Sequence, residues 1–126
     1  MIAYTVFQPL QEIEVSDDMA SLYQYYKFSG KEEEIVLFVL RHNLVSILVE
    51  ATREIKSVFK KNLSFLELKL QQDPEENFKG LFIIIHTDLP SRHAVEVLDK
   101  LDEKWWLYMD DEVSNVLEIT VRANEV

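Results

Sequence analysis

The chain has 126 residues, 48% of them hydrophobic, and can therefore bury a core as one domain without a disulfide or metal staple. It contains no cysteine, which excludes thiol catalysis and thiolate zinc sites and favours a cytoplasmic location. The net charge of −10 argues against nucleic-acid binding, because Lys and Arg supply most of the non-specific attraction to phosphates.

The N-terminal segment, residues 1–30, is predicted to be an appended arm, and residues 31–126 are predicted to form the single domain. Within the arm, AYTVF is typical of a short strand, and SLYQYYKF can form a short helix or a strand. The segment has no Lys or Arg before an apolar run, so no secretory signal is expected. No uncharged apolar stretch approaches about twenty residues, so no membrane span is expected either.

The domain begins with the continuous apolar run Ile35 to Leu40, which favours a strand buried on both faces. The same run can also begin a long helix, because periodicity alone does not separate the two. From Leu44 to Phe59 the apolar residues recur at helical spacing, which predicts an amphipathic helix.

The second half of the domain alternates strands and a helix. LSFLELKLQ and GLFIIIHT are separated by the turn-rich DPEENFKG and predict a hairpin. Asp88 and Pro90 are typical of a helix start, and the helix is expected to continue to the tryptophan pair. The alternating VLEITVR predicts a last strand with a polar solvent side.

The predicted order is therefore β-α-β-β-α-β. This is the ferredoxin-like split βαβ arrangement of the α+β class, with two helices on one face of an antiparallel sheet. The crossovers are expected to be right-handed. If Ile35 to Leu40 are helical, a three-stranded α+β sheet remains, to which AYTVF can add the first strand.

Catalytic and metal-binding motifs are scarce. The sequence lacks GxGxxG, GxxxxGK[ST] and G-x-S-x-G, and we expect neither an enzyme nor a bound cofactor. His86, Asp88 and His93 in HTDLPSRH are the only grouping that suggests a metal, but their spacing matches no known ligand motif. They are therefore weak candidates, and no metal is expected.

The stretch LDEKWWLYMDDE combines aromatic and acidic residues. Trp105 continues the buried helical series, whereas Trp106 is rotated from it by about 100° and can face outward. An outward Trp106 beside Tyr108 and Met109, rimmed by acids that include Asp110 and Asp111, would form an association surface. The alternative is that WWLYM closes the end of the core.

The only basic patch consists of Arg53, Lys56, Lys60 and Lys61, in a segment, residues 36–72, of net charge +3. It can bind an acidic partner, including the acidic C-terminal half of another copy. Alternatively, it is a solvated helix face.

The C-terminal pattern L-D-x-x-D-x-x-W-W-L, residues 98–107, followed by a turn and an alternating strand, is similar to a pattern in small uncharacterised bacterial proteins. The resemblance covers about the last sixty residues, including FIIIHTDLP. It implies no activity, catalytic residue or cofactor. Short stand-alone proteins of this kind often act as antitoxin-like or adaptor partners.

Together these features predict a non-catalytic protein–protein interaction module. It is expected to self-associate, as a homodimer or other homo-oligomer, or to bind a basic partner protein. The alternative is a regulatory domain of ferredoxin-like type that binds a small molecule or a metal.

Overall fold

The computed structural model describes residues 19–73, 75 and 78–123. Residues 19–25 are helical and precede the first strand. The remaining elements, with two short 3-10 turns named η1 and η2, are β1 (Tyr26–Ser29), α2 (Glu32–Arg41), α3 (Val45–Phe59), η1 (Lys60–Asn62), β2 (Leu63–Asp73), β3 (Phe78–Thr87), α4 (Ser91–Lys104), η2 (Trp106–Tyr108), α5 (Asp111–Ser114) and β4 (Leu117–Ala123).

The strands form one sheet in the order β1-β2-β3-β4. β1 pairs with β2 in parallel, β2 with β3 in antiparallel and β3 with β4 in parallel. The α+β class is therefore confirmed, and so is the hairpin of β2 and β3. The prediction of an antiparallel ferredoxin-like sheet was wrong, because the sheet is mixed and strands that are consecutive in the sequence are neighbours in it.

The main error lies in the run Ile35 to Leu40, which is helical and belongs to α2. Ile35, Phe38 and Val39 are buried at helical spacing, while Leu37 and Leu40 face outward. Three glutamates occupy the first turn of α2, where negative charge complements the helix dipole. Because leucines occupy exposed positions that are usually polar, the sequence of this helix resembles that of a buried strand.

The first strand comes from YKFS instead. In β1, Tyr26 pairs with Leu66 of β2. Tyr26 is buried, and its hydroxyl donates a hydrogen bond of 2.7 Å to the carbonyl of Leu48. Leu22, in the preceding helix, is also part of the core. The expected arm boundary after residue 30 falls between β1 and α2, and AYTVF lies outside the described residues.

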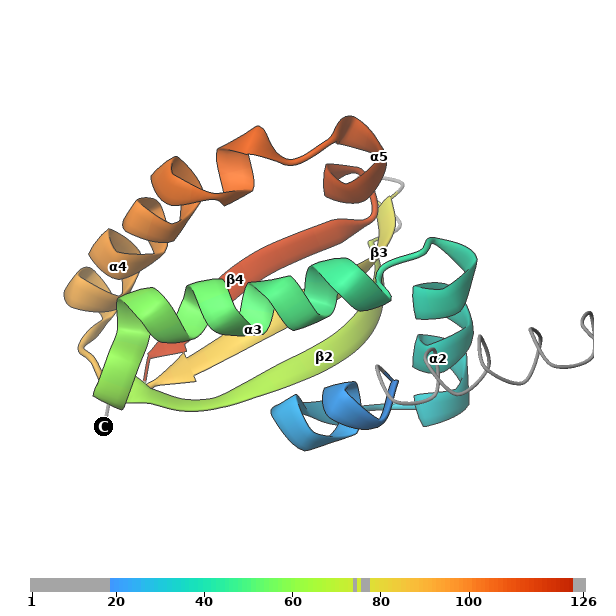
Figure 1. Ribbon diagram of the computed structural model, residues 1–126, viewed down its shortest axis with the longest axis horizontal. Helices are drawn as coiled ribbons and strands as arrows, with labels where there is room; N and C mark the ends of the chain where they lie inside the picture. The colour runs from blue at the N-terminus through green and yellow to red at the C-terminus, as the bar shows by residue number, and fades with distance from the viewer. Residues whose placement is uncertain (1–18, 74, 76–77, 124–126) are drawn as a thin grey trace, which may run out of the picture.

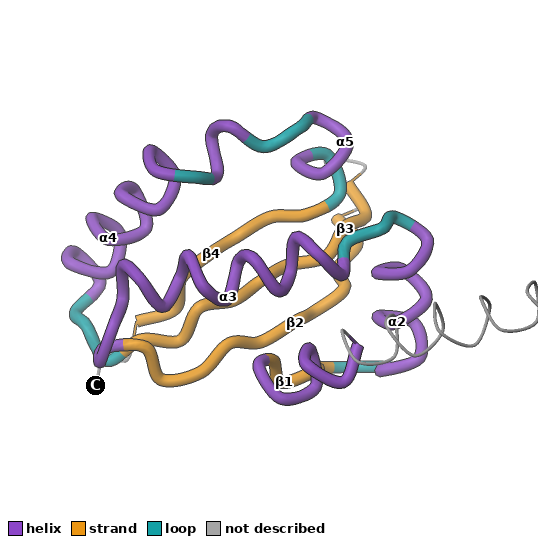
Figure 2. Tube along the Cα trace, in the orientation of Figure 1, coloured by secondary structure: helices purple, strands orange, loops and turns teal. Residues whose placement is uncertain are grey.

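The helices α3 and α4 cover one face of the sheet (Figure 1, Figure 2). As predicted, α3 buries Leu48, Ala51 and Ile55. They join a single core cluster with inward residues of the sheet such as Leu68 and Ile83. The core therefore lies between this helix layer and the sheet.

The two parallel pairs run in opposite directions, so connections that pass over the same face have opposite hands. In Figure 1 the β3–α4–β4 connection is right-handed and the β1–α2–α3–β2 connection is left-handed. The right-handed rule therefore holds for the connection with one long helix. It fails for the connection in which α2 and α3 are placed in series.

Among the residues that the structure describes, no single helix is long and apolar enough to cross a membrane. The pair Glu32–Arg41 and Val45–Asn62 meets the criteria of length and composition only jointly, and it is bent by 103° at its break.

Candidate interaction site

The tryptophan pair lies where α4 ends. Trp105 leaves the helical conformation, with φ −142° and ψ −53°, and terminates α4 without a glycine or proline. Its ring is only 8% exposed, and its indole N–H donates a hydrogen bond of 2.8 Å to Oε1 of Glu50 on α3. Trp105 therefore fixes the end of α4 to α3, as its predicted place in the buried series required.

Residues 106–112, which we call the aromatic lobe, follow directly. Trp106 and Met109 are half-buried and pack against the core cluster, whereas Leu107 and Tyr108 are 71% and 80% exposed. Asp110 and Asp111 are exposed beside them. The outward apolar surface of the lobe is thus formed mainly by Leu107 and Tyr108.

Leu107 was not among the residues predicted from the sequence. A continued α-helix would have rotated Trp106 outward, but α4 ends at Lys104 and the chain turns through η2. The only available signal was the position of Leu107 within the aromatic run between Glu103 and Asp110. The turn expected after residues 98–107 contains a short helix, α5.

The backbone of the lobe is held by hydrogen bonds. The amides of Tyr108 and Met109 donate to the carbonyls of Trp105 and Trp106 at 3.2 and 3.1 Å. The two indole rings lie 5.7 Å apart at 48°. Leu107 and Tyr108 are therefore presented on a fixed turn, and a binding partner would not have to order it.

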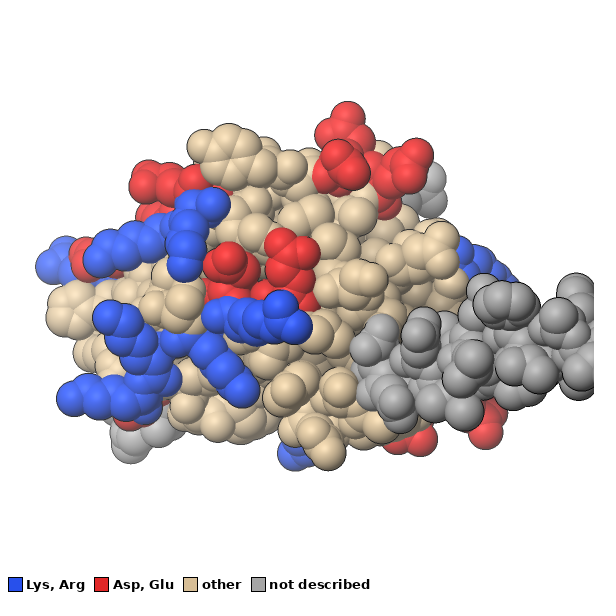
Figure 3. All heavy atoms as spheres, viewed as in Figure 1, with Lys and Arg blue, Asp and Glu red and all other residues tan. Residues whose placement is uncertain are grey.

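Acidic residues flank the exposed tip on both sides in the sequence. Glu103, Asp110, Asp111 and Glu112 are exposed, and within the described residues none of them forms an ion pair. In Figure 3 carboxylates gather over the α5 end of the molecule. Burial, followed by repulsion from Asp99, raises the pKa of Asp102. The lobe thus combines apolar area with concentrated negative charge.

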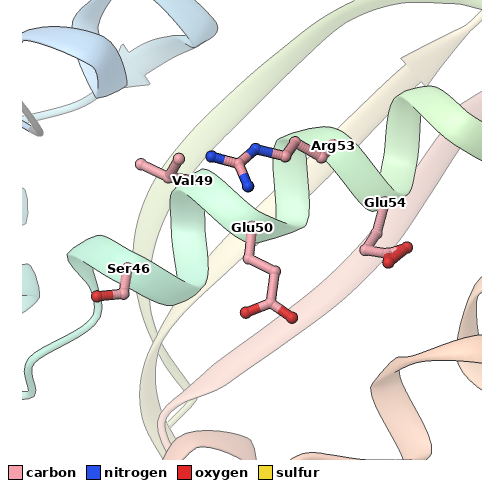
Figure 4. Close-up of a pocket in the computed structure, with 5 residues that line it drawn as sticks. All are labelled: Ser46, Val49, Glu50, Arg53 and Glu54. Atoms are coloured by element: carbon pink, nitrogen blue, oxygen red, sulfur yellow. The ribbon is translucent and has the colours of Figure 1, made fainter.

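A cavity of about 520 Å³ lies beside α3. Its lining consists of Ser46, Val49, Glu50, Arg53 and Glu54 (Figure 4). Glu50 accepts the Trp105 hydrogen bond, and Glu54 pairs with Lys104 at 3.3 Å. Both carboxylates therefore hold the C-terminal end of α4, directly before the lobe.

The residues HTDLPSRH do not form one site. His86 lies on β3 and contacts Oε1 of Glu67 at 2.7 Å through Nε2, whereas Asp88 and His93 are exposed. Asp88 does not cap α4, whose N-cap residue is Pro90. Across the described part of the chain, no group of three or more His, Cys, Asp or Glu residues is placed to hold a metal ion.

The sheet face away from α3 and α4 carries a second polar cluster. The Phe65 and His86 rings stack with centroids 4.0 Å apart, beside the contact between His86 and Glu67. A hydrogen bond from Ser29 and the contact with His86 lower the pKa of Glu67, although partial burial opposes them. This cluster links β1, β2 and β3. Stabilisation of the sheet explains it without a binding or catalytic role.

Comparison of the chain with protein-family models, curated proteins and solved structures gives no match. The resemblance of residues 98–107 to a bacterial pattern therefore stays a prediction.

Proposed function

We propose that the protein is a non-catalytic protein–protein interaction module, and that the aromatic lobe is its contact surface. The partner is another copy of this chain or a basic protein. The observation that carries the proposal is the exposure of Leu107 and Tyr108 on a hydrogen-bonded turn, next to carboxylates that form no ion pair with any described residue.

The apolar tip supplies a binding anchor of useful size. Burying a leucine side chain contributes roughly 1.5–3 kcal/mol, and a tyrosine buries about 150–250 Å² at an interface. Association itself costs at least about 4 kcal/mol. The lobe is therefore the centre of a larger interface of roughly 800 Å² per partner.

The charge of the lobe selects the kind of partner. Asp110, Asp111 and Glu112 would repel acidic proteins and attract basic surfaces, and such complementarity raises encounter rates and favours correct pairs. These contacts are exposed to water, so added salt should weaken them. A basic protein surface fits this chemistry.

The described titratable groups support a non-catalytic role. Catalytic acids and bases usually combine a shifted pKa with a place in a cleft. Tyr26 has a raised pKa because it is buried, and it is hydrogen-bonded within the core. Glu67 and Asp102 also have shifted pKa values, but neither lines any of the three cavities found around α2, α3 and α4.

The test is the double variant Leu107→Ala/Tyr108→Ala. Because both side chains are largely exposed, we expect unfolding free energy to change by less than about 0.5 kcal/mol, while association is lost. Sedimentation velocity of the purified chain measures self-association, and capture from a lysate measures binding to other proteins.

The matched control is Tyr25→Ala/Leu37→Ala, which removes one exposed aromatic and one exposed leucine elsewhere. The control should associate and capture partners as the unchanged chain does. If the lobe variant also keeps both properties, the lobe is not the contact surface and the proposal is wrong.

A further inference from the structure

A groove at the other end of α4 has the opposite charge to the lobe. It lies between the end of α3 and the first turns of α4 and has a volume of about 520 Å³. Apolar residues that include Val58, Leu89 and Val97 line it together with Lys60, Lys61 and Lys100. We call it the basic groove.

The three lysines of the basic groove have no ion-pair partner within residues 19–73, 75 and 78–123. All three are exposed, and the only acidic residue of the lining is Glu96. Figure 3 shows the corresponding concentration of basic side chains at the end of the molecule where α3 finishes. The groove is therefore suited to a ligand that combines apolar and anionic groups.

The backbone at Lys60 is unusual. Its φ of 51° and ψ of −127° lie in a region that favours glycine, and such a residue costs of the order of 1–3 kcal/mol. The turn sends the chain from α3 into β2 and places Lys60 and Lys61 at the groove. A lysine here is less favourable for the fold than a glycine would be, and it adds a positive charge to the groove.

On the premise of the proposed function, we infer that the basic groove of one copy binds the aromatic lobe of a second copy. The lobe presents Leu107 and Tyr108 to the apolar lining, and its acids Asp110, Asp111 and Glu112 to the lysines. The volume is within the roughly 300–1,000 Å³ typical of binding cavities. Three cationic and three anionic side chains then face each other.

The lobe and the groove of one chain are not in contact. The groove is lined by α4 residues from His93 to Lys100, whereas the lobe begins beyond the end of α4 at Trp106. Tyr108 is 80% exposed, so it does not occupy its own groove. The contact therefore joins two molecules through different surfaces. It can close as a reciprocal pair or ring, or continue as a chain.

Two variants test this contact separately. Lys61→Glu/Lys100→Glu reverses the charge of the groove, and Leu107→Ala/Tyr108→Ala removes the tip of the lobe. Each alone should weaken self-association by about tenfold or more, because each copy has lost one half of the contact. An equimolar mixture should recover association as a one-to-one dimer, since one variant supplies the lobe and the other the groove.

The control for net charge is Lys31→Glu/Lys69→Glu, which changes two exposed lysines outside the groove. It should associate like the unchanged chain. Thermal unfolding of every variant checks the fold. If a double variant unfolds, the single variants Lys100→Glu and Tyr108→Ala take its place. Each is expected to show a smaller loss of association.

The outcomes separate this inference from the proposed function. If the lobe variant loses association but the groove variant does not, or if the mixture fails to recover it, the groove is not the receptor and only the inference is overturned. If the unchanged chain stays monomeric at all concentrations, the inference is overturned, while lobe-dependent capture of another protein still supports the proposed function. A lobe variant that self-associates normally overturns the inference, and one that also captures other proteins normally overturns both.

Discussion

Trp105 and Tyr108, three positions apart in the sequence, lie in contrasting environments. Trp105 is 8% exposed and hydrogen-bonded to Glu50, whereas Tyr108 is 80% exposed and contributes little to the core. Trp105 directly follows the end of α4, whereas Tyr108 is the last residue of η2. One aromatic cluster in the sequence therefore divides into a part that stabilises the fold and a part that is available for binding.

The largest effect is expected from Trp105→Ala. It should lower the free energy of unfolding by about 3–5 kcal/mol, because it removes a buried ring and leaves Glu50 without its donor. Urea denaturation measures the change. Trp105→Phe, which keeps a ring but not the N–H, should cost less. A loss below about 1 kcal/mol for the alanine variant would mean that Trp105 is not an anchor.

A smaller effect, in the opposite direction, is expected at the groove. Lys60→Gly should raise the free energy of unfolding by about 1 kcal/mol, because glycine adopts the observed backbone conformation without strain. The same change should weaken self-association. Lys61→Gly is the comparison, since Lys61 does not have a positive φ. A less stable Lys60→Gly variant would show that the turn is not strained.

The smallest effect concerns Asp102, which lies on α4 shortly before the lobe. The raised pKa of Asp102 means that its ionised form destabilises the fold at neutral pH, and that this cost disappears as pH falls through the raised pKa. Asp102→Asn should therefore stabilise the protein at pH about 7, by less than about 0.5 kcal/mol because the group is partly solvated, and have no such effect at pH about 3. Urea denaturation at both pH values checks this, and equal effects at both would contradict it.

Helices and strands with clear periodicity were predictable from the sequence. The helical spacing of Leu48, Ala51 and Ile55 and the alternation in β2 both reflect one buried face. The prediction of a strand at Ile35 to Leu40 was wrong because Leu37 and Leu40 are apolar but exposed. Their apolar type hid the helical period. The sequence did not decide the structure of Tyr26–Ser29, because this short segment suits either a helix or a strand.

The site was only partly predictable. Tyr108 and the neighbouring acids could be proposed from their types, but the exposure of Leu107 depends on the end of α4, which no glycine or proline marks. The groove depends on the fold. Lys61 and Lys100 are far apart in the chain and come together only because α3 and α4 pack on the same sheet face.

The most direct test of the account places the photo-crosslinking residue p-benzoylphenylalanine at position 108 of the otherwise unchanged chain. After irradiation of the purified protein, mass spectrometry identifies the attached peptide. The account predicts a product of twice the chain mass in which position 108 is joined to the groove, within residues 58–62 or 89–100 of a second copy. A product that remains at the mass of one chain, or one joined to a different surface of the second copy, would contradict the lobe–groove contact.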